Sequence, residues 1–418
     1  MNRLGESIIT QTKVFYGWYV VMSGFVIMFA AFSIINALHS LFLVPVTEDL
    51  GMSRTTFSLA LSITGLGVAG ASPFMGRFLV KSNMKLIMSV CVIVAGLGFA
   101  SFSLANSALY FCVVGFLIGI CVAGFSNIPI SIMITNWFYE KKGMAMGIAF
   151  AGSGVGAAAL SPLLSSFIEQ FGWRISYVIA GGLVIVITLP FVLLFTKKSP
   201  IEKGVIALGS NNQVTTVQLH EEESGMTVGE AKTSAKFWLF IIGIVCFALV
   251  AGGVQMHIPA YLVDIGHPVL FAGTIFGLLS LTNTVGKLIL GVVLDKFRTV
   301  GGAIYVGICM TIAMLALLSA TTQSLAFVFA IAYGLSISIA TLGPPFMTDD
   351  LFGKKNFGQL FGIVQVFFVA TSSLGVIVSG FIYDVTNSYR FAWIFFMCLF
   401  ILGMACVLIA TSIKKNHP

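Results

Sequence analysis

A single lysine, Lys287, lies inside the apolar stretch FAGTIFGLLSLTNTVGKLILGVVL (residues 271–294). About 20 apolar residues are enough to cross a bilayer as a helix. A charge at that depth costs roughly 3 kcal/mol or more, and it usually faces a wet cavity or a partner. We therefore expect Lys287 to lie on a transport pathway. The alternative is that its ammonium snorkels to the interface near Asp295, about eight residues or roughly 12 Å away.

The acidic residues give Lys287 no obvious partner. All 15 Asp and Glu residues fall in loops or at the ends of apolar runs. An unpaired buried ammonium should favour an anion that completes the pair. A single cation favours a single negative charge, so the substrate itself could supply the carboxylate. Hydroxyl groups, His257 or His39 could accommodate a second charge.

The composition predicts an all-α polytopic membrane protein. Of the 418 residues, 58% are hydrophobic and 9% are charged, and the mean hydropathy is +1.03, which is more apolar than a soluble core requires. The lipid bilayer is therefore an expected partner, and nucleic acid is not. Twelve transmembrane helices are expected at residues 17–38, 55–76, 86–105, 108–134, 143–168, 175–196, 237–259, 270–294, 301–320, 324–346, 357–380 and 391–413.

The net charge of +7 is explained by its distribution over the loops. Of 22 Lys and Arg residues, only Arg54, Arg174 and Arg390 lie on the side opposite the termini, and Lys287 lies within a span, which leaves 18 on the side of the termini. The positive-inside rule then places both termini in the cytoplasm, with the protein in the plasma or inner membrane. We also expect a monomer.

The second half of the chain repeats the first. The segment WFYEKKG at 137–143 corresponds to LFGKKN at 351–356, and WRISY at 173–177 corresponds to YRFAW at 389–393. The segment GRFLVK at 76–81 likewise corresponds to GVVLDK at 291–296. These offsets agree closely, which predicts two pseudo-symmetric halves with a site between them, as in secondary transporters. We expect a six-helix half at 1–196, a cytoplasmic linker at 197–236 and a second six-helix half at 237–418.

Polar residues within the spans are candidates for a pocket wall. Asn36 and His39 lie near the outer half of span 1, although a polar group in a helix bundle can equally join two helices. Asn127 accompanies Pro129, in a region that membrane interiors tolerate beside a cavity. His257 precedes Pro259, where we expect the helix to open, which makes it a ligand or proton-relay candidate unless it lies at the outer interface.

Glycines recur through residues 143–156 in the sequence GMAMGIAFAGSGVG. The four- and five-residue steps between Gly143, Gly147, Gly152 and Gly156 are typical of helices that pack closely in lipid. A glycine-rich phosphate loop would need a following Gly-Lys-Ser/Thr and a preceding strand, and neither is present.

The sequence has no signature of an enzyme. It contains no HExxH, Walker A or dinucleotide-binding motif. The seven cysteines lie in apolar runs without the spacing of a metal site. We therefore expect neither a cofactor nor a bound metal.

Taken together, the twelve spans and the basic loops at 76–85 and 291–298 resemble the major facilitator superfamily. More specifically, the chain resembles the monocarboxylate transporters and their bacterial relatives, including oxalate:formate antiporters. The segments that carry this resemblance are YGWYVV (16–21), WFYEKKGMAMGIAFAGSGVG (137–156) and HIPAYLVDIG (257–266). The first loop has Val80 where that superfamily usually has Asp.

The resemblance implies roles for particular residues. In that group an Arg in span 8 holds the substrate carboxylate, and Lys287 matches its position without the bidentate fork of an Arg. A proton-linked Asp lies four residues earlier in the animal proteins, where this chain has Asn283. Val364 replaces a lysine of oxalate carriers, which speaks against a dicarboxylate. The same alignment places four more residues in the pocket: Asn36, His39, Asn127 and Thr341.

These observations predict a secondary transporter of a small monocarboxylate such as lactate, pyruvate or formate, working by proton symport or anion exchange. Lys287 would pair with the carboxylate, and Asn283 and Asn127 would hydrogen-bond the substrate. Because burial makes an ammonium release its proton more readily, Lys287 could itself carry a proton. The alternatives are efflux of larger amphipathic acids or drugs, and a membrane sensor, for which the linker is too short and polar.

Overall fold

The protein is a bundle of long helices, described here from a computed structural model that covers residues 15–52, 54–209, 225–320 and 322–413. Both chain termini and part of the predicted linker, including Glu221–Glu223, lie outside these residues. Ten helical stretches of the described chain are long and apolar enough to cross a membrane. Two of them fold back on themselves, so the described residues account for the twelve predicted crossings.

The helices before the linker run through the first six spans. They are α1 (Gly17–Ile27), η1 (Met28–Ala37), η2 (Leu38–Phe42), α2 (Leu43–Leu50), α3 (Arg54–Lys81), α4 (Met84–Ser101), η3 (Phe102–Leu104), α5 (Ala108–Phe125), α6 (Asn127–Trp137) and α7 (Lys142–Phe195). Two short helices follow, η4 (Pro200–Lys203) and α9 (Val228–Thr233). The remaining spans are α10 (Ala235–Asp264), α11 (Val269–Leu318), α12 (Gln323–Ile337), α13 (Ile339–Phe352), α14 (Phe357–Thr386) and α15 (Tyr389–Ser412).

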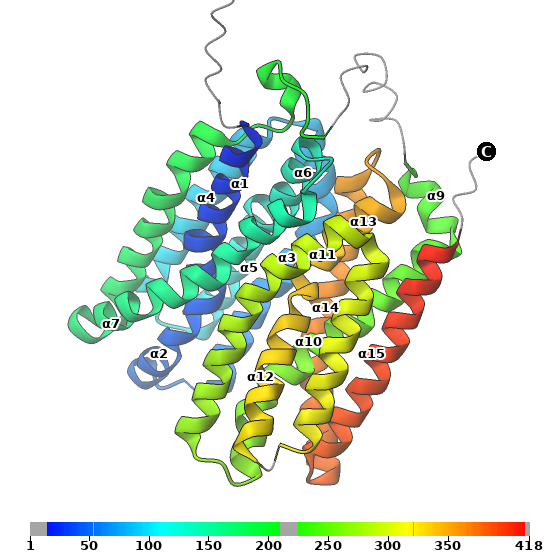
Figure 1. Cartoon of the computed structure of the whole chain (residues 1–418). Helices are drawn as coiled ribbons and strands as arrows, with labels where there is room; N and C mark the ends of the chain where they lie inside the picture. Colours follow the sequence, from blue (N-terminus) through cyan, green and yellow to red (C-terminus); the bar gives the residue numbers. More distant parts are fainter. Residues whose placement is uncertain (1–14, 53, 210–224, 321, 414–418) are drawn as a thin grey trace, which may run out of the picture.

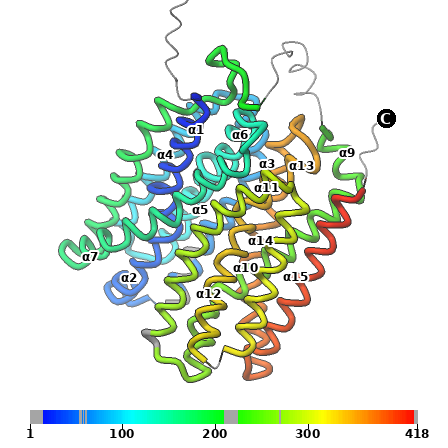
Figure 2. Tube along the Cα trace, in the orientation of Figure 1, coloured from blue at the N-terminus to red at the C-terminus, as the bar shows by residue number. Residues whose placement is uncertain are grey.

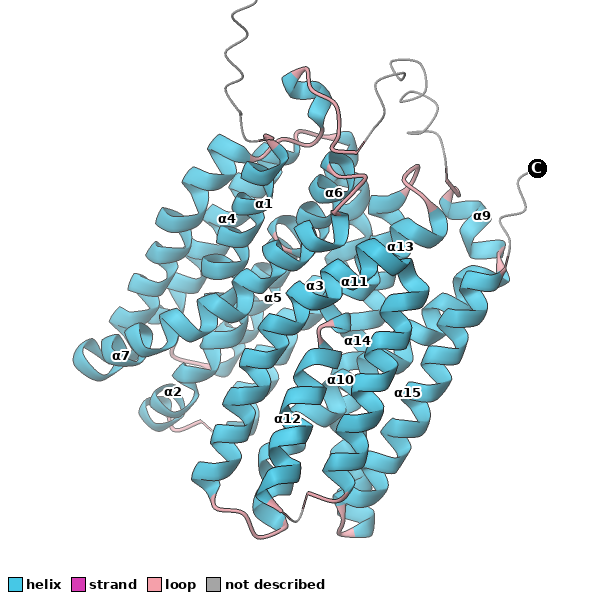
Figure 3. Cartoon of the chain, in the orientation of Figure 1, coloured by secondary structure: helices cyan, strands magenta, loops and turns pink. Residues whose placement is uncertain are grey.

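The two longest helices each contain a sharp bend. At 1.5 Å per residue, 50 residues would extend about 75 Å, far more than the ~30 Å hydrocarbon core. α7 turns at Gly172 (φ 75°) and α11 turns at Arg298 (φ 57°), so each supplies two crossings. Apart from the connection between α7 and α9, Figure 3 shows short loops between the other long helices.

Both described ends of the chain lie at the same end of the bundle. The start of α1 and the end of α15 both lie on the upper side of the bundle in Figure 1. We call this the termini end and the opposite one the far end. The helices before and after the linker form two neighbouring groups, drawn blue to green and green to red in Figure 2.

The glycines of α7 pack closely against other helices, as predicted. A Cβ on Gly143 would come within 2.3 Å of the Gly291 carbonyl oxygen, and one on Gly147 within 2.5 Å of the Lys287 carbonyl oxygen. A Cβ on Gly152 would likewise lie 2.3 Å from the Phe25 carbonyl oxygen. α7 therefore lies in backbone contact with α1 on one side and with α11 on the other.

The two groups of helices meet along two seams. One joins α7 to α11 through Gly143 and Gly291, and the other joins α3 to α14. In the second seam a Cβ on Gly76 would lie 1.9 Å from the Gly358 carbonyl oxygen. A Cβ on Gly362 would lie 2.5 Å from the Ser72 carbonyl oxygen. Both seams lie towards the termini end, so this end of the bundle is closed.

Candidate functional site

Lys287 is enclosed where α11 meets α7. Its side chain is buried, with the residue 5% exposed. Its Nζ donates hydrogen bonds to the Phe150 carbonyl oxygen at 3.2 Å and to the Ser153 Oγ at 2.8 Å. Among the described residues it forms no ion pair with a carboxylate. The ammonium therefore keeps two neutral acceptors and lacks a counter-charge, as the distribution of acidic residues predicted.

A π-helix contacts Ser153, the residue whose hydroxyl accepts from Lys287. The segment η1 (Met28–Ala37) is wound as a π-helix, a rare form that occurs often at functional sites. Ser33 in this segment donates from its Oγ to the Ser153 carbonyl oxygen at 2.8 Å. Ser153 thus links η1 to Lys287, so three spans from both groups of helices meet at one serine.

Two asparagines predicted for the site carry buried oxygens without a partner. Asn283 lies one turn before Lys287 on α11, and its Oδ1 is buried with no hydrogen bond. Asn127 begins α6, directly after the break in the span at Ser126 (φ −95°, ψ −121°), and its Oδ1 is also buried and unpaired. A buried polar atom without a partner is costly, so such atoms often mark a place where a ligand or water binds.

The other predicted polar residues occupy different surroundings. Asn36 is exposed, and its Nδ2 donates to the Phe32 carbonyl oxygen of its own helix at 3.2 Å. Thr341 is half-buried in the first turn of α13, just after Ser338. The described contacts connect neither residue to Lys287.

Both histidines are bonded to tyrosines near the far end. His39 Nε2 lies 3.0 Å from the Tyr177 hydroxyl, within a cluster of aromatic rings that includes Phe99 and Phe102. His257 Nδ1 lies 3.0 Å from the Tyr389 hydroxyl. His257 Nε2 lies 3.1 Å from the Val376 carbonyl oxygen, so this nitrogen carries the proton and Nδ1 accepts from the tyrosine. Each histidine joins the first and last spans of its own repeat.

The expectation that the helix opens beside His257 is wrong. α10 continues as a helix from Ala235 to Asp264, with Pro259 inside it. A proline can remain within a membrane helix when neighbouring helices satisfy the freed backbone groups. His257 therefore projects from a continuous helix.

Charged residues hold neighbouring helices together between Lys287 and the termini end. Lys142, at the start of α7, forms a buried ion pair with Asp349 of α13. The Asp295 carboxylate accepts hydrogen bonds from the backbone N–H groups of Gly143 at 2.5 Å and Met144 at 2.7 Å. A carboxylate at a helix N-terminus is stabilised by the helix dipole, so Asp295 fastens α11 to the beginning of α7.

The sequence reasoning missed several of these residues. Ser153 lies in the glycine-rich motif, whose spacing predicts helix packing and assigns no role to its one polar side chain. Lys142 is 207 residues away from Asp349, and no local pattern could pair them.

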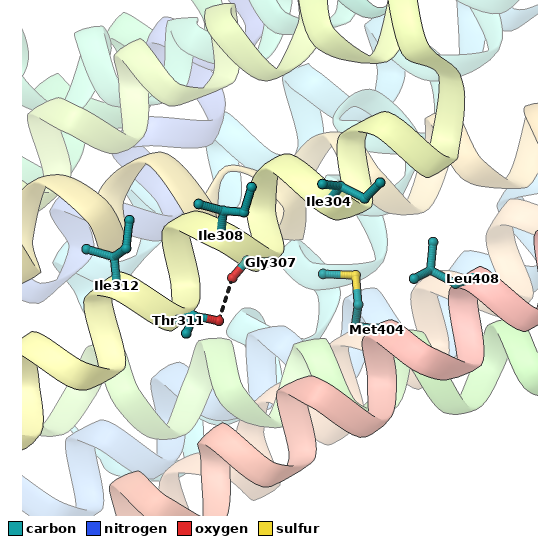
Figure 4. Close-up of a pocket in the computed structure, with 7 residues that line it drawn as sticks. All are labelled: Ile304, Gly307, Ile308, Thr311, Ile312, Met404 and Leu408. Carbon is teal, nitrogen blue, oxygen red and sulfur yellow. Dashed lines mark hydrogen bonds between the residues drawn. The ribbon is translucent and has the colours of Figure 1, made fainter.

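A separate groove of about 390 Å³ lies on the outside of the bundle (Figure 4). Its walls are residues of α11 after the bend and of α15: Ile304, Gly307, Ile308, Thr311, Ile312, Met404 and Leu408. Ile304 and Ile308 are more than half exposed. An apolar groove on the membrane face suits lipid tails, so we do not assign the polar substrate to it.

Comparisons with known proteins agree with this architecture. The profile of the Major Facilitator Superfamily matches residues 20–349. Monocarboxylate transporter 12 of Xenopus laevis is 25% identical over 357 residues, covering 80% of this chain and 76% of the relative. Monocarboxylate transporter 1 of Rattus norvegicus is 33% identical over 174 residues, which span 41% of this chain and 34% of that protein.

Solved structures share the fold at low identity. The proton:xylose symporter XylE superposes with a TM-score of 0.72 and 12% identity, covering 94% of this chain and 95% of XylE. The fucose:proton symporter FucP of E. coli gives a TM-score of 0.68 at 15% identity, with 94% and 98% coverage. These similarities confirm the predicted fold of two repeated six-helix halves.

Proposed function

The chain belongs to the major facilitator superfamily, and from this premise we propose that it carries a small monocarboxylate, such as lactate, pyruvate or formate, by alternating access. The protein is a multi-pass membrane transporter and not an enzyme. The names of the monocarboxylate transporters it resembles support the proposed class of substrate.

The observation that carries the proposal is the buried Lys287 without a counter-charge. A carboxylate reaching Lys287 would supply the missing negative charge. The Nδ2 groups of Asn283 and Asn127 could donate to its oxygens, and their Oδ1 atoms could accept from a substrate hydroxyl. Lysine binds as a point charge, so one carboxylate oxygen would suffice.

Proton symport and anion exchange both fit this site. Asn283 cannot take up a proton as an Asp would. In a symport mechanism we assign the proton to Lys287, which would release it when the anion leaves. In an exchange mechanism a second anion would replace the first, and Lys287 would stay charged. Transport that ignores an imposed proton gradient would favour exchange.

The two repeats and the loop between them define the moving parts of the transporter. We propose that residues 1–196 and 237–418 form the two moving halves and that residues 197–236 connect them. The excess of basic loop residues supports a cytoplasmic termini end in a plasma or inner membrane. We further propose that one copy is a complete transporter, since residues of a single chain surround Lys287.

The test is uptake of radiolabelled lactate, pyruvate, formate and acetate into proteoliposomes. We expect saturable uptake that Lys287→Ala abolishes, because the anion then enters a site without a counter-charge, and that Lys287→Arg partly retains. Lys85→Ala, which removes a lysine from the first turn of α4, is the matched control and should transport normally. Uptake that does not depend on Lys287 would refute the proposal and favour efflux of larger amphipathic acids.

A further inference from the structure

A second cavity, of about 430 Å³, opens at the termini end between the start of α7 and the bend of α11. Its walls come from both groups of helices: Tyr139, Glu140, Lys141, Lys142, Met144, Val292, Asp295, Lys296, Arg298 and Phe346. The contact between Gly143 and Gly291 lies between this cavity and Lys287 along α7 and α11. The cavity is therefore distinct from the proposed substrate site.

Positive charge predominates in this cavity. Four cations and two carboxylates line it. The carboxylate of Asp295 is already bonded to two backbone N–H groups, and the Glu140 side chain lies against Gly209. Among the described residues neither Lys141 nor Lys296 pairs with a carboxylate.

The other two cations are paired with carboxylates of α13. Lys142 is held by Asp349, and Arg298 lies 3.1 Å from Asp350 through its Nη1. Arg298 remains largely exposed, so only part of its guanidinium is engaged. The cavity thus presents two ammonium groups without a carboxylate partner and the remaining donors of an arginine, although Lys296 Nζ also lies 5.2 Å from the centroid of the Phe297 ring.

Backbone strain is concentrated at the same place. Three non-glycine residues of the described chain have positive φ, and two of them, Lys141 (φ 58°) and Arg298 (φ 57°), line this cavity. Arg298 has ψ −163°, a combination that is almost restricted to glycine. Strained residues persist when the surrounding structure holds them, and they gather at ligand sites and switches. Packing alone does not require a basic residue at either position.

We propose that this cavity binds an anionic phosphate group and that binding holds the termini end closed. Several cations around one space suit a group with three or four oxygens better than a single carboxylate. Basic pockets of this kind at the cytoplasmic side of membrane proteins bind phospholipid head groups, and inorganic phosphate presents the same chemistry. Because the walls come from both halves, the site exists only while the α7–α11 seam is closed.

The test compares two sources of phosphate and requires no transport assay. Melting of the purified protein in detergent is followed with increasing inorganic phosphate, against sodium chloride at equal ionic strength. Melting is also compared between nanodiscs of phosphatidylcholine and of phosphatidylglycerol. The variants are Lys141→Gln with Lys296→Gln, and Lys81→Gln, which removes the lysine at the equivalent position of the first repeat.

We expect the melting temperature to rise with phosphate and to reach a plateau. The double variant should need at least about ten times more phosphate for the same rise, because hydrogen bonds from charged groups to the phosphate are lost. Lys81→Gln should respond as the unmodified protein does. A rise with inorganic phosphate identifies a soluble ligand, and a rise only with phosphatidylglycerol identifies a lipid head group. A response that the double variant retains in full, or no response to either source, would overturn the proposal.

Discussion

The Lys287 ammonium can bond to Ser153 when the site is empty and to a carboxylate when substrate is bound. In the closed structure the Ser153 Oγ accepts from the Lys287 Nζ at 2.8 Å, which satisfies part of the ammonium. A carboxylate would provide a stronger, charged acceptor. Substrate and serine should therefore compete for the same lysine.

This competition can be measured with Ser153→Ala. A hydrogen bond to a charged group contributes about 1.5–3 kcal/mol, and its loss destabilises the empty site more than the occupied one. We expect the affinity for the anion to rise, by about tenfold for each 1.4 kcal/mol. Equilibrium binding of the labelled substrate found in uptake assays would measure this. Ser101→Ala, whose hydroxyl bonds only to Gly98 of its own helix, is the control. Equal affinities in all three proteins would show that Ser153 does not compete.

At the residue scale, the sequence predicted the buried and unpaired state of Lys287 correctly, because the length of the apolar run and the positions of all the carboxylates are visible in it. The surroundings of the histidines were not visible. His39 and His257 are bonded to tyrosines 138 and 132 residues away. Contacts over that distance depend on how the helices pack, which no local pattern encodes.

At the element scale, the close helix contacts are what keep the termini end shut. Gly143 and Gly291 face each other across the α7–α11 seam, and a Cβ on Gly291 would lie 2.4 Å from the Gly143 carbonyl oxygen. A methyl group cannot be accommodated at that distance without moving one backbone. The sequence predicted the packing role of Gly143 from its spacing, but it did not identify α11 as the partner.

We expect Gly291→Ala to separate α7 from α11 and to open the termini end. Gly273→Ala on the same helix is the control, because a Cβ there meets no atom within 4 Å, and alanine favours a helix over glycine by up to about 1 kcal/mol. Spin labels at Ser82, between α3 and α4, and at Val300, two residues after the bend of α11, would report the distance across this end. A distance in Gly291→Ala that equals the distance in the control would contradict the prediction.

At the scale of the whole molecule, the two seams are related by the internal repeat but are fastened differently. Gly143 packs against Gly291 in one seam, and Gly358 packs against Gly76 in the other. The first is fastened by Asp295, whereas Val80 occupies the equivalent position in the second and its Cγ2 would lie 3.0 Å from a Cβ on Gly358. The sequence predicted the twelve spans from its apolar runs, and it showed Val80 where the superfamily usually has Asp, because both are visible without knowing how the helices pack.

Val80→Asp should fasten the second seam as Asp295 fastens the first. A carboxylate near the N-terminus of α14 would gain about 0.3–1 kcal/mol, and up to about 2 kcal/mol if partly buried. We expect the closed state to become more populated and turnover in proteoliposomes to fall, by roughly fivefold for 1 kcal/mol. Val80→Asn, which lacks the charge, should have a smaller effect. Faster turnover in the aspartate variant would contradict this account.

The histidine–tyrosine pairs at the far end have a mechanical consequence. His39 bonds to Tyr177 and His257 bonds to Tyr389, so each pair holds the first span of one repeat against the last span of the same repeat. The seams between the repeats lie towards the other end of the molecule. Each repeat can therefore rotate as a rigid body about an axis near Lys287. If the α7–α11 and α3–α14 seams separate at the termini end, this rotation brings the two repeats together at the far end.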